Sequence, residues 1–296
     1  MEKDKHTNEN KSREHETLLQ VFIRSFFRNK LGVIGLIGVI IIILVALLAP
    51  YIVEPVSGYG DFENILNPPS QAHPFGTDDM GLDIFSQVIW GTRTSLQVGF
   101  LTVLIALVIG VPIGLISGYF DNFLATIGMG LTDVFLTLPV LPLMIIMAAV
   151  IGSDIKNIAL VIGLFSWPKL ARITRASTLS VRNMEYITAA EGLGASNFKI
   201  LYKHVLPNVS APILVNMTII IATAILSEAG LSFLGLGDPL TWSWGKILEN
   251  AHQSGAFLSA WWYSLFPSLA IMFFVVSFNF IGMGIREALN PKLRQR

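Results

Sequence analysis

Two acidic residues occupy positions where a carboxylate could do chemistry, because each lies within or beside a strongly apolar segment. Asp133 stands in Leu131-Thr132-Asp133-Val134, and Glu228 lies near the end of a second apolar run. Arg93 is a basic residue at the start of a third. Charge is costly in hydrocarbon, so such residues are candidates for proton transfer, ligand binding or pairing. We interpret Asp133 as the structural partner of a cation or backbone donor, with direct substrate or proton handling as the alternative.

The chain lacks the residue patterns of an enzyme or a metal site. It has no cysteine, which excludes disulfides, thiolate ligands and a thiol nucleophile. Its five histidines are scattered, and no H-E-x-x-H pattern occurs. Gly245-Lys246 lacks the upstream glycine and the following hydroxyl of a phosphate-binding loop. We therefore predict no catalytic residue, no metal ligand, no cofactor and no ATP hydrolysis in this chain.

A polar stretch between two apolar segments has the residue types of a docking element. Asn183 can cap a short helix whose first turn holds Glu185, where the helix dipole favours a carboxylate. Ala189 and Ala190 give that helix a thin face, and Gly194 lets the chain leave it in a conformation costly for other residues. A thin face of this kind suits a helix that seats in a groove on another protein.

A second short helix is predicted directly after the first. Ser196 or Asn197 can cap it, and Pro207 is expected to terminate it before the next apolar segment begins. Its apolar residues are Phe198, Leu201, Tyr202 and Val205. The alternative for the whole stretch is an ordinary polar loop.

The composition indicates that a membrane protein positions these residues. Hydrophobic residues make up 53% of the 296 residues and charged residues only 14%, whereas a soluble domain carries about a quarter charged residues. We predict an all-α fold with six transmembrane helices of roughly 20 residues, the length that crosses about 30 Å of hydrocarbon. They are placed at 31–52, 95–118, 123–150, 157–176, 209–229 and 262–285.

Prolines modify two of these spans. The third is interrupted by Pro139 and Pro142, which predicts a broken or kinked helix. The fourth has the shortest apolar part, and Pro168 and Lys169 follow it directly.

The basic residues predict the orientation, because Lys and Arg accumulate in cytoplasmic segments beside spans. Both chain ends and the stretch 169–203 are basic, whereas residues 51–91 contain acids but no Lys or Arg. We therefore place both termini in the cytoplasm, which requires an even number of crossings. The same distribution accounts for the basic residues without any nucleic acid partner.

This orientation divides the chain into five parts. They are a cytoplasmic N-terminal segment (1–30), a first transmembrane anchor (31–52), an external loop (53–91), a transmembrane core (92–285) and a cytoplasmic tail (286–296). The core includes a cytoplasmic loop at 177–208 and an external loop at 230–260. In the first part, Leu18, Phe22 and Phe26 recur at helical spacing beside arginines, which is typical of a helix on the inner membrane surface. A frayed extension of the first span is the alternative.

Two glycine stripes predict close helix packing. Gly110, Gly114 and Gly118 lie four residues apart, so one helix face carries no side chain and a neighbouring backbone can approach. The first span has a similar stripe at 32, 35 and 38.

The polar stretch resembles a known membrane-protein motif. Thr188-Ala189-Ala190, Gly194 and Leu206-Pro207 resemble the EAA loop of membrane subunits of bacterial ATP-binding cassette (ABC) importers, E-A-A-x3-G-x9-I-x-L-P. Thr188 stands where glutamate is most typical, and His204 occupies the isoleucine position. The run from His204 to Asn208 is similar to the H-x-L-P-N form of the dipeptide, oligopeptide and nickel branch.

Other stretches resemble the same branch and extend the likeness over 71–291. They are His73-Pro74-Phe75-Gly76-Thr77-Asp78, Gly81-Leu82-Asp83, Trp167 with Ala171-Arg172 and Arg175, and the run 231–237 followed by Trp244-Gly245. The resemblance implies a type I ABC importer permease fold in a bacterial cell membrane.

The resemblance also implies partners that this chain does not contain. A paralogous permease would complete the path through the lipid bilayer, two cytoplasmic ATPase subunits would bind ATP and magnesium, and an external solute-binding protein would deliver the substrate. The implied substrates are dipeptides or oligopeptides, with nickel or a metallophore as the alternative. The short helix near 188–192 would be the coupling helix, and the implied coupling residues are Glu185, Thr188, Ala189, Ala190, Glu191, Gly194, Leu206 and Pro207.

Two rival functions make different predictions. Gly235-Leu236-Gly237-Asp238 spells the G-x-G-D of intramembrane aspartyl proteases, with Asp133 as the nominal second acid. Asp238, however, precedes a proline and is placed outside the bilayer. A secondary transporter would also use broken helices and buried charge, but it would transport without any ATPase partner.

Overall fold

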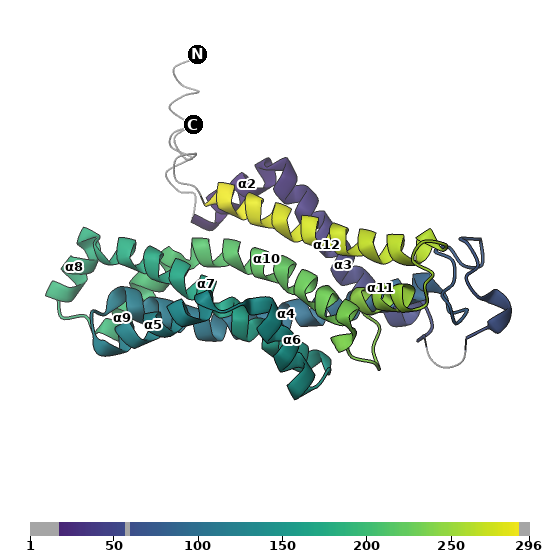
Figure 1. Cartoon of the computed structure of the whole chain (residues 1–296). Helices are drawn as coiled ribbons and strands as arrows, with labels where there is room; N and C mark the ends of the chain where they lie inside the picture. Colours follow the sequence, from purple (N-terminus) through teal and green to yellow (C-terminus); the bar gives the residue numbers. More distant parts are fainter. Residues whose placement is uncertain (1–17, 57–59, 290–296) are drawn as a thin grey trace, which may run out of the picture.

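The protein is a bundle of long helices, seen in a computed structural model that describes residues 18–56 and 60–289 (Figure 1). Within these residues the chain forms helices, turns and one isolated bridge between Thr77 and Asp83. The predicted all-α fold is confirmed. Parts of both predicted cytoplasmic ends, residues 1–17 and 290–296, lie outside the described residues.

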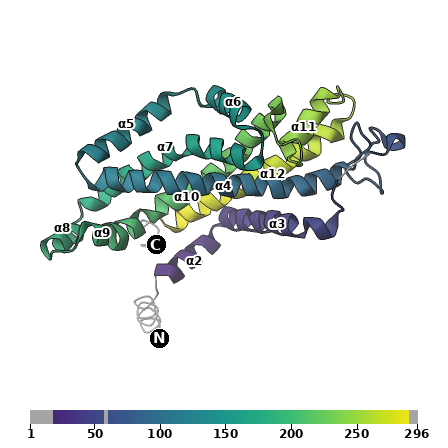
Figure 2. The same cartoon turned by 90° about the horizontal axis from the view of Figure 1, so that it is seen from below.

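The long helices run along the bundle, and the short ones lie either beside them or at its two ends (Figures 1 and 2). The long helices are α3 (Lys30–Ile52), α4 (Ile84–Tyr119), α7 (Ile155–Arg182), α10 (Leu206–Leu231) and α12 (Trp261–Ala288). The shorter ones are α2 (Leu18–Arg28), α5 (Phe123–Thr137), α6 (Val140–Ile151), α8 (Glu185–Gly192), α9 (Asn197–Ile200) and α11 (Trp244–Gln253), with η1 (Phe62–Asn64), η2 (Leu201–Val205) and η3 (Ser232–Leu236). In both views α8 and α9 lie at one end, and α11 and the loop between α3 and α4 lie at the other.

Length and hydropathy identify four helices that can cross a membrane. They are α3, α4, the continuous helix Asn197–Leu236 that contains α10, and α12. Helices α5 and α6 pass the same test only as a pair bent by 93° near Pro139, which brings the number to five and confirms the predicted break. Helix α7 has 28 residues, about 42 Å at 1.5 Å per residue, but its second half carries Lys169 and Arg172. Six crossings therefore stays a prediction that depends on α7.

The second span begins earlier than its apolar run suggested. Helix α4 starts at Ile84 rather than near 95, so the loop after α3 is shorter than the predicted 53–91. Asp83 caps this start, because its side chain accepts a 2.8 Å hydrogen bond from the backbone N–H of Ser86. The first turns of α4 mix apolar residues with polar ones and with Arg93, so the continuous apolar run used for the prediction begins only after them.

Both glycine stripes lie at helix contacts, as predicted. A Cβ atom added to Gly114 of α4 would lie 2.6 Å from the carbonyl oxygen of Ala171 on α7. A Cβ atom added to Gly35 of α3 would lie 2.6 Å from the carbonyl oxygen of Ser277 on α12. These distances leave no room for a side chain, so the two helix pairs pack through their backbones.

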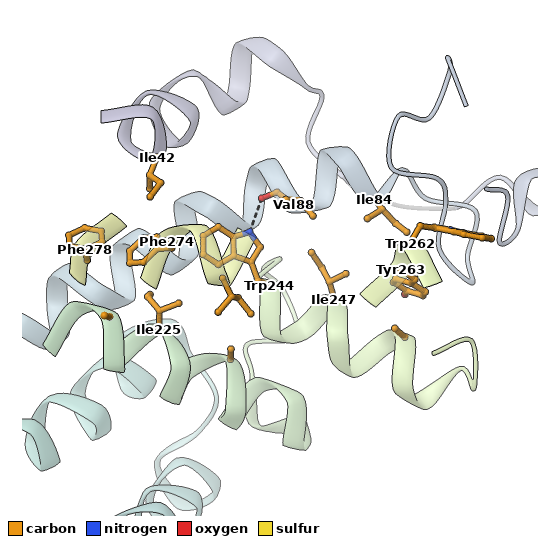
Figure 3. Close-up of a cluster of buried hydrophobic side chains, with 14 of the residues drawn as sticks. Ile42, Ile84, Val88, Ile225, Trp244, Ile247, Trp262, Tyr263, Phe274 and Phe278 are labelled. Atoms are coloured by element: carbon orange, nitrogen blue, oxygen red, sulfur yellow. Dashed lines mark hydrogen bonds between the residues drawn. The ribbon is translucent and has the colours of Figure 1, made fainter. Parts of the chain in front are cut away.

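The end of the bundle near α11 has a core of large aromatic side chains (Figure 3). Trp244, Tyr263 and Phe274 are at most 2% exposed. The Trp244 indole Nε1–H donates a 3.0 Å hydrogen bond to the carbonyl oxygen of Val88, and its ring centroid lies 5.8 Å from that of Phe274. This core joins α4, α11 and α12.

A buried carboxylate fixes the loop that precedes α4. Asp78 is 1% exposed, and its Oδ1 accepts 2.8 Å hydrogen bonds from the backbone N–H groups of Met80 and Leu82. Burial raises the pKa of the Asp78 carboxyl, and these hydrogen bonds oppose that rise. The Tyr263 hydroxyl donates a 2.8 Å hydrogen bond to Asp79 and ties the loop to α12. Residues 78–82 are therefore held in place by the fold.

Helix α2 packs partly on α12. Phe26 is 8% exposed, and a Cβ atom added to Gly284 would lie 2.8 Å from the Phe26 ring. Phe27 is instead 60% exposed. Phe26, expected on the membrane-facing stripe with Phe22, thus points into the bundle because Gly284 leaves space for its ring. The side chain of Leu18 lies outside the described residues, and the placement of α2 on the membrane surface stays a prediction.

Candidate functional site

The predicted docking stretch forms the short helix α8 and the first turns of the helix that starts at α9, at one end of the bundle (Figure 1). We call residues 177–208 the coupling loop. Its first helix, α8, has Glu185 in its first turn, as predicted. Asn183 does not cap it, because its φ and ψ of −82° and 7° are not extended, and Asn183 instead ends α7. The extended residue at the cap is Met184, which makes no side-chain capping bond.

The two alanines of the coupling loop point in different directions. Ile187 is fully buried, and Ala190 is half-buried against the same core. Thr188, Ala189 and Gly192 are exposed. The predicted thin face therefore includes Ala189 but not Ala190. We define the exposed face of α8 by Glu185, Thr188, Ala189 and Gly192, which follow helical spacing.

Gly194 turns the chain out of α8, as predicted. Its φ of +79° lies in the left-handed region that favours glycine. Its backbone N–H bonds to the carbonyl oxygen of Glu191 at 2.9 Å. A Cβ atom added to Gly194 would meet no atom within 4 Å, so the backbone conformation, not close packing, requires glycine here.

Pro207 does not terminate the second helix, contrary to the prediction. Helices α9, η2, α10 and η3 form the continuous helix Asn197–Leu236, which Ser196 caps as predicted. The turn before Pro207 is a π-helix, in which the Leu206 N–H bonds to the Leu201 carbonyl oxygen. Proline lacks an N–H and clashes with the carbonyl four residues earlier in a regular α-helix. The wider π turn lets the helix continue through this position.

Buried side chains anchor the coupling loop to the long helices. Ile187, Ile200 and Val205 are fully buried in a cluster that also contains Leu170 of α7. Leu206, a predicted coupling residue, packs against this cluster and therefore has a structural contact. The coupling loop is consequently joined rigidly to the ends of α4, α7 and α10.

The coupling loop also exposes large apolar side chains that we did not predict to dock. Leu193 is 89%, Phe198 79% and Tyr202 69% exposed. The rings of Phe198 and Tyr202 stack with their centroids 6.5 Å apart. Their i, i+4 spacing was visible in the sequence and could have identified them as one patch. Exposed apolar groups on an anchored element indicate a protein contact.

Tyr119, at the end of α4, connects the coupling loop to that helix. Its hydroxyl donates a 2.7 Å hydrogen bond to Glu191 Oε1 of α8 and lies 3.4 Å from Asn197 Oδ1 of α9. The guanidinium carbon of Arg182 lies 6.0 Å from the centroid of the Tyr119 ring. Arg182 also pairs with Asp121 at 2.7 Å. The predicted coupling residue Glu191 is thus exposed but uses one carboxylate oxygen for a contact with α4.

The two acids proposed from the sequence have different surroundings. Asp133 forms an ion pair with Arg172 of α7, with 2.6 Å between Asp133 Oδ1 and Arg172 Nη2. This agrees with the interpretation of Asp133 as the structural partner of a cation. Glu228 is 2% exposed and accepts a 2.7 Å hydrogen bond from the Ser232 hydroxyl. Within the described residues, no group of three or more potential ligands could hold a metal ion.

The structure does not bring together the acids of the protease hypothesis. Asp133 is on α5, whereas Asp238 follows η3 in the loop before α11. These elements lie toward opposite ends of the bundle in both views (Figures 1 and 2). Asp133 is also already paired with Arg172, so a pair of acids sharing one proton does not form.

A bundle of helices long and apolar enough to cross a membrane, with a polar loop packed on one end, defines the class of polytopic membrane proteins. Residues 110–295 match the family described as the binding-protein-dependent transport system inner membrane component. Residues 17–69 match the N-terminal transmembrane domain of oligopeptide transport permease C. The chain belongs to this family and is a permease subunit of an ABC importer.

Two relatives are similar in sequence to this chain over most of its length and most of their own. The dipeptide transport system permease protein DppC of Alkalihalophilus pseudofirmus is 40% identical, over 90% of this chain and 88% of that one. The glutathione transport system permease protein GsiD of Pectobacterium atrosepticum is 37% identical, over 92% and 91%. The inward-facing MetNI methionine ABC transporter aligns with a TM-score of 0.47 at 17% identity, over 63% of this chain and 95% of that one.

Proposed function

We propose that this chain pairs with a paralogous permease to form a path for dipeptides or oligopeptides, and that two ATPase subunits drive the path through the coupling loop. The observation that carries the proposal is the exposed face of α8 on a loop anchored by fully buried isoleucines. A rigid anchored helix can transmit a displacement to the spans, whereas a flexible loop would absorb it. ATP and magnesium would be bound by the partners.

Peptides are the substrate class that the relatives favour. Two of them are named for dipeptide transport and for glutathione transport, and glutathione is itself a small peptide. This supports a peptide over the nickel or metallophore alternative. Delivery by an external solute-binding protein follows from the family, whose name includes that dependence.

Reconstitution in liposomes tests the proposed function. The chain with its paralogous permease, both ATPase subunits and loaded binding protein should accumulate a labelled dipeptide only when ATP is supplied on the ATPase side. The chain alone should accumulate none. Accumulation by the lone chain along an ion gradient would instead establish the secondary-transporter alternative.

The proposed orientation makes a separate prediction. A reporter fused after Pro69 should read as external, and one fused after Asn197 as cytoplasmic, because basic residues flank the second position but not the first. Both termini should read as cytoplasmic, which requires α7 to cross the membrane. If both reporters read on the same side of the membrane, α7 does not cross it.

A further inference from the structure

A pocket of about 330 Å³ opens at the end of the bundle opposite α8. It lies between the first turns of α4, the start of α7 and the loop that joins η3 to α11. Small-molecule sites typically have volumes of about 300–1,000 Å³. The pocket therefore has room for a small ligand.

Two fixed indole rings form walls of this pocket. Trp90 donates its Nε1–H to the carbonyl oxygen of Glu54 at 3.1 Å, and Trp242 donates its Nε1–H to that of Val56 at 3.1 Å. Each bond ties a ring to the segment that follows α3. Because their polar atoms are occupied, the rings offer apolar faces at fixed positions.

Arg93 is the single charged residue that lines this pocket. Its guanidinium carbon lies 5.8 Å from the centroid of the Trp90 ring, and its side chain is exposed. Among the described residues, no carboxylate pairs with it. Stacking on a ring leaves the in-plane N–H groups of a guanidinium free for an anion.

Neutral polar groups complete the lining. The Thr241 hydroxyl is buried and has no hydrogen-bond partner within the part of the chain that the structure describes. Thr94 and Gln97 lie one residue and one turn beyond Arg93 on α4 and also line the pocket. The hydroxyl is closed to solvent, so a ligand would bond to it only after the Thr241 side chain turned toward the pocket. That bond would then remove the cost of a buried polar group without a partner.

We propose that this pocket binds the carboxylate end of a small peptide as the peptide enters from the binding protein. Arg93 would hold the carboxylate in a two-point hydrogen-bonded pair, and the indole rings would cover an apolar side chain of the peptide. The inference rests on the proposed peptide transport. A phosphate of a lipid headgroup could also pair with arginine, but it would not need the enclosed indole walls or the buried hydroxyl of Thr241.

A fluorescent label at the pocket rim tests this site. Leu240 lines the pocket and is 91% exposed, and the chain has no cysteine, so Leu240→Cys gives this chain one labelling position. The labelled, assembled transporter, with cysteine-free partner subunits, is placed in lipid nanodiscs and titrated with glycyl-leucine and with its C-terminal amide. We expect a saturable signal change with the free peptide. The amide should need an about tenfold higher concentration for half of the maximal signal. Arg93→Gln should raise the half-maximal concentration of the free peptide about tenfold.

Lys156→Gln is the matched control. Lys156 is an exposed cation next to the pocket-lining Ile155, but it does not line the pocket itself. This variant should respond as the parent does. Equal responses to peptide and amide, an unchanged response in Arg93→Gln, or no response at all would overturn the site. Competition by inorganic phosphate as strong as that by the peptide would indicate a general anion or headgroup site and would also overturn it.

ATP-driven uptake by the same labelled transporter, now reconstituted in liposomes with loaded binding protein, separates the two proposals. Uptake without a carboxylate-dependent signal would refute the pocket and leave the proposed function intact. Loss of peptide uptake in the parent complex would refute the proposed function itself.

Discussion

Glutamate in place of Ala189 is expected to release the ATPase subunits and abolish ATP-driven uptake, while the chain stays folded in the membrane. Ala189 is exposed on α8, and the fully buried Ile187 holds that helix in place. A charged side chain there would fill the space that a docking groove needs and would lose its hydration on contact. Losses at central contact positions reach about 3 kcal/mol, which is more than a hundredfold in affinity. Copurification of the ATPase with the tagged chain measures the effect.

Two neighbouring substitutions make this test specific. Thr188→Glu adds the same charge one residue earlier and restores the residue most typical of the EAA loop, so it should preserve copurification. Ala190→Glu should reduce the amount of folded protein, because Ala190 packs against the internal cluster. Copurification of Ala189→Glu at the parent level would show that the ATPase does not dock on this face.

Sequence patterns predicted those features of the fold that depend on neighbours along the chain. The break at Pro139 and the glycine stripe around Gly114 follow from the backbone properties of single residues, and both are found. The start of α4 at Ile84 was missed because its first turns interrupt apolar residues with polar ones, and Ile84 and Val88 gain their burial from other elements. The continuation through Pro207 was missed because it requires a π turn, for which no residue pattern was evident.

In the coupling loop, too, features set by neighbouring residues were predicted and those set by distant elements were not. Gly194 was predicted correctly, because a left-handed turn after a helix has a strong local signal. Which alanine faces outward depends on where the core lies, and the core is assembled from α4, α7 and α10. Tyr119 had no sequence signal at all. Its partner Glu191 is 72 residues away in the chain.

Tyr119 gives the coupling loop a direct connection to the span that packs most closely on α7. Its hydroxyl reaches both α8 and α9, and its ring lies within 6.0 Å of the Arg182 guanidinium at the end of α7. A force on α8 would therefore act on α4 through Tyr119 and on α7 through the chain itself. Close backbone packing at Gly114 makes these two helices respond together. Tyr119 is thus a positioning residue rather than a docking residue.

Tyr119→Ala is accordingly expected to uncouple ATP hydrolysis from uptake. The ATPase should still copurify and hydrolyse ATP, because the exposed face of α8 is unchanged. The amount of peptide accumulated per ATP hydrolysed should fall by about tenfold or more. The reason is that truncating a buried aromatic side chain costs about 3–5 kcal/mol of local packing. Tyr119→Phe keeps the ring and removes only the hydroxyl, so the expected fall is smaller, about fivefold for a bond of about 1 kcal/mol. Glu191→Gln in the Tyr119→Phe background should add little, because the hydroxyl from which Glu191 accepts is already absent there. Equal losses of ATP hydrolysis and uptake would instead assign Tyr119 to docking, and an unchanged ratio in Tyr119→Ala would show that α4 receives no force through this contact.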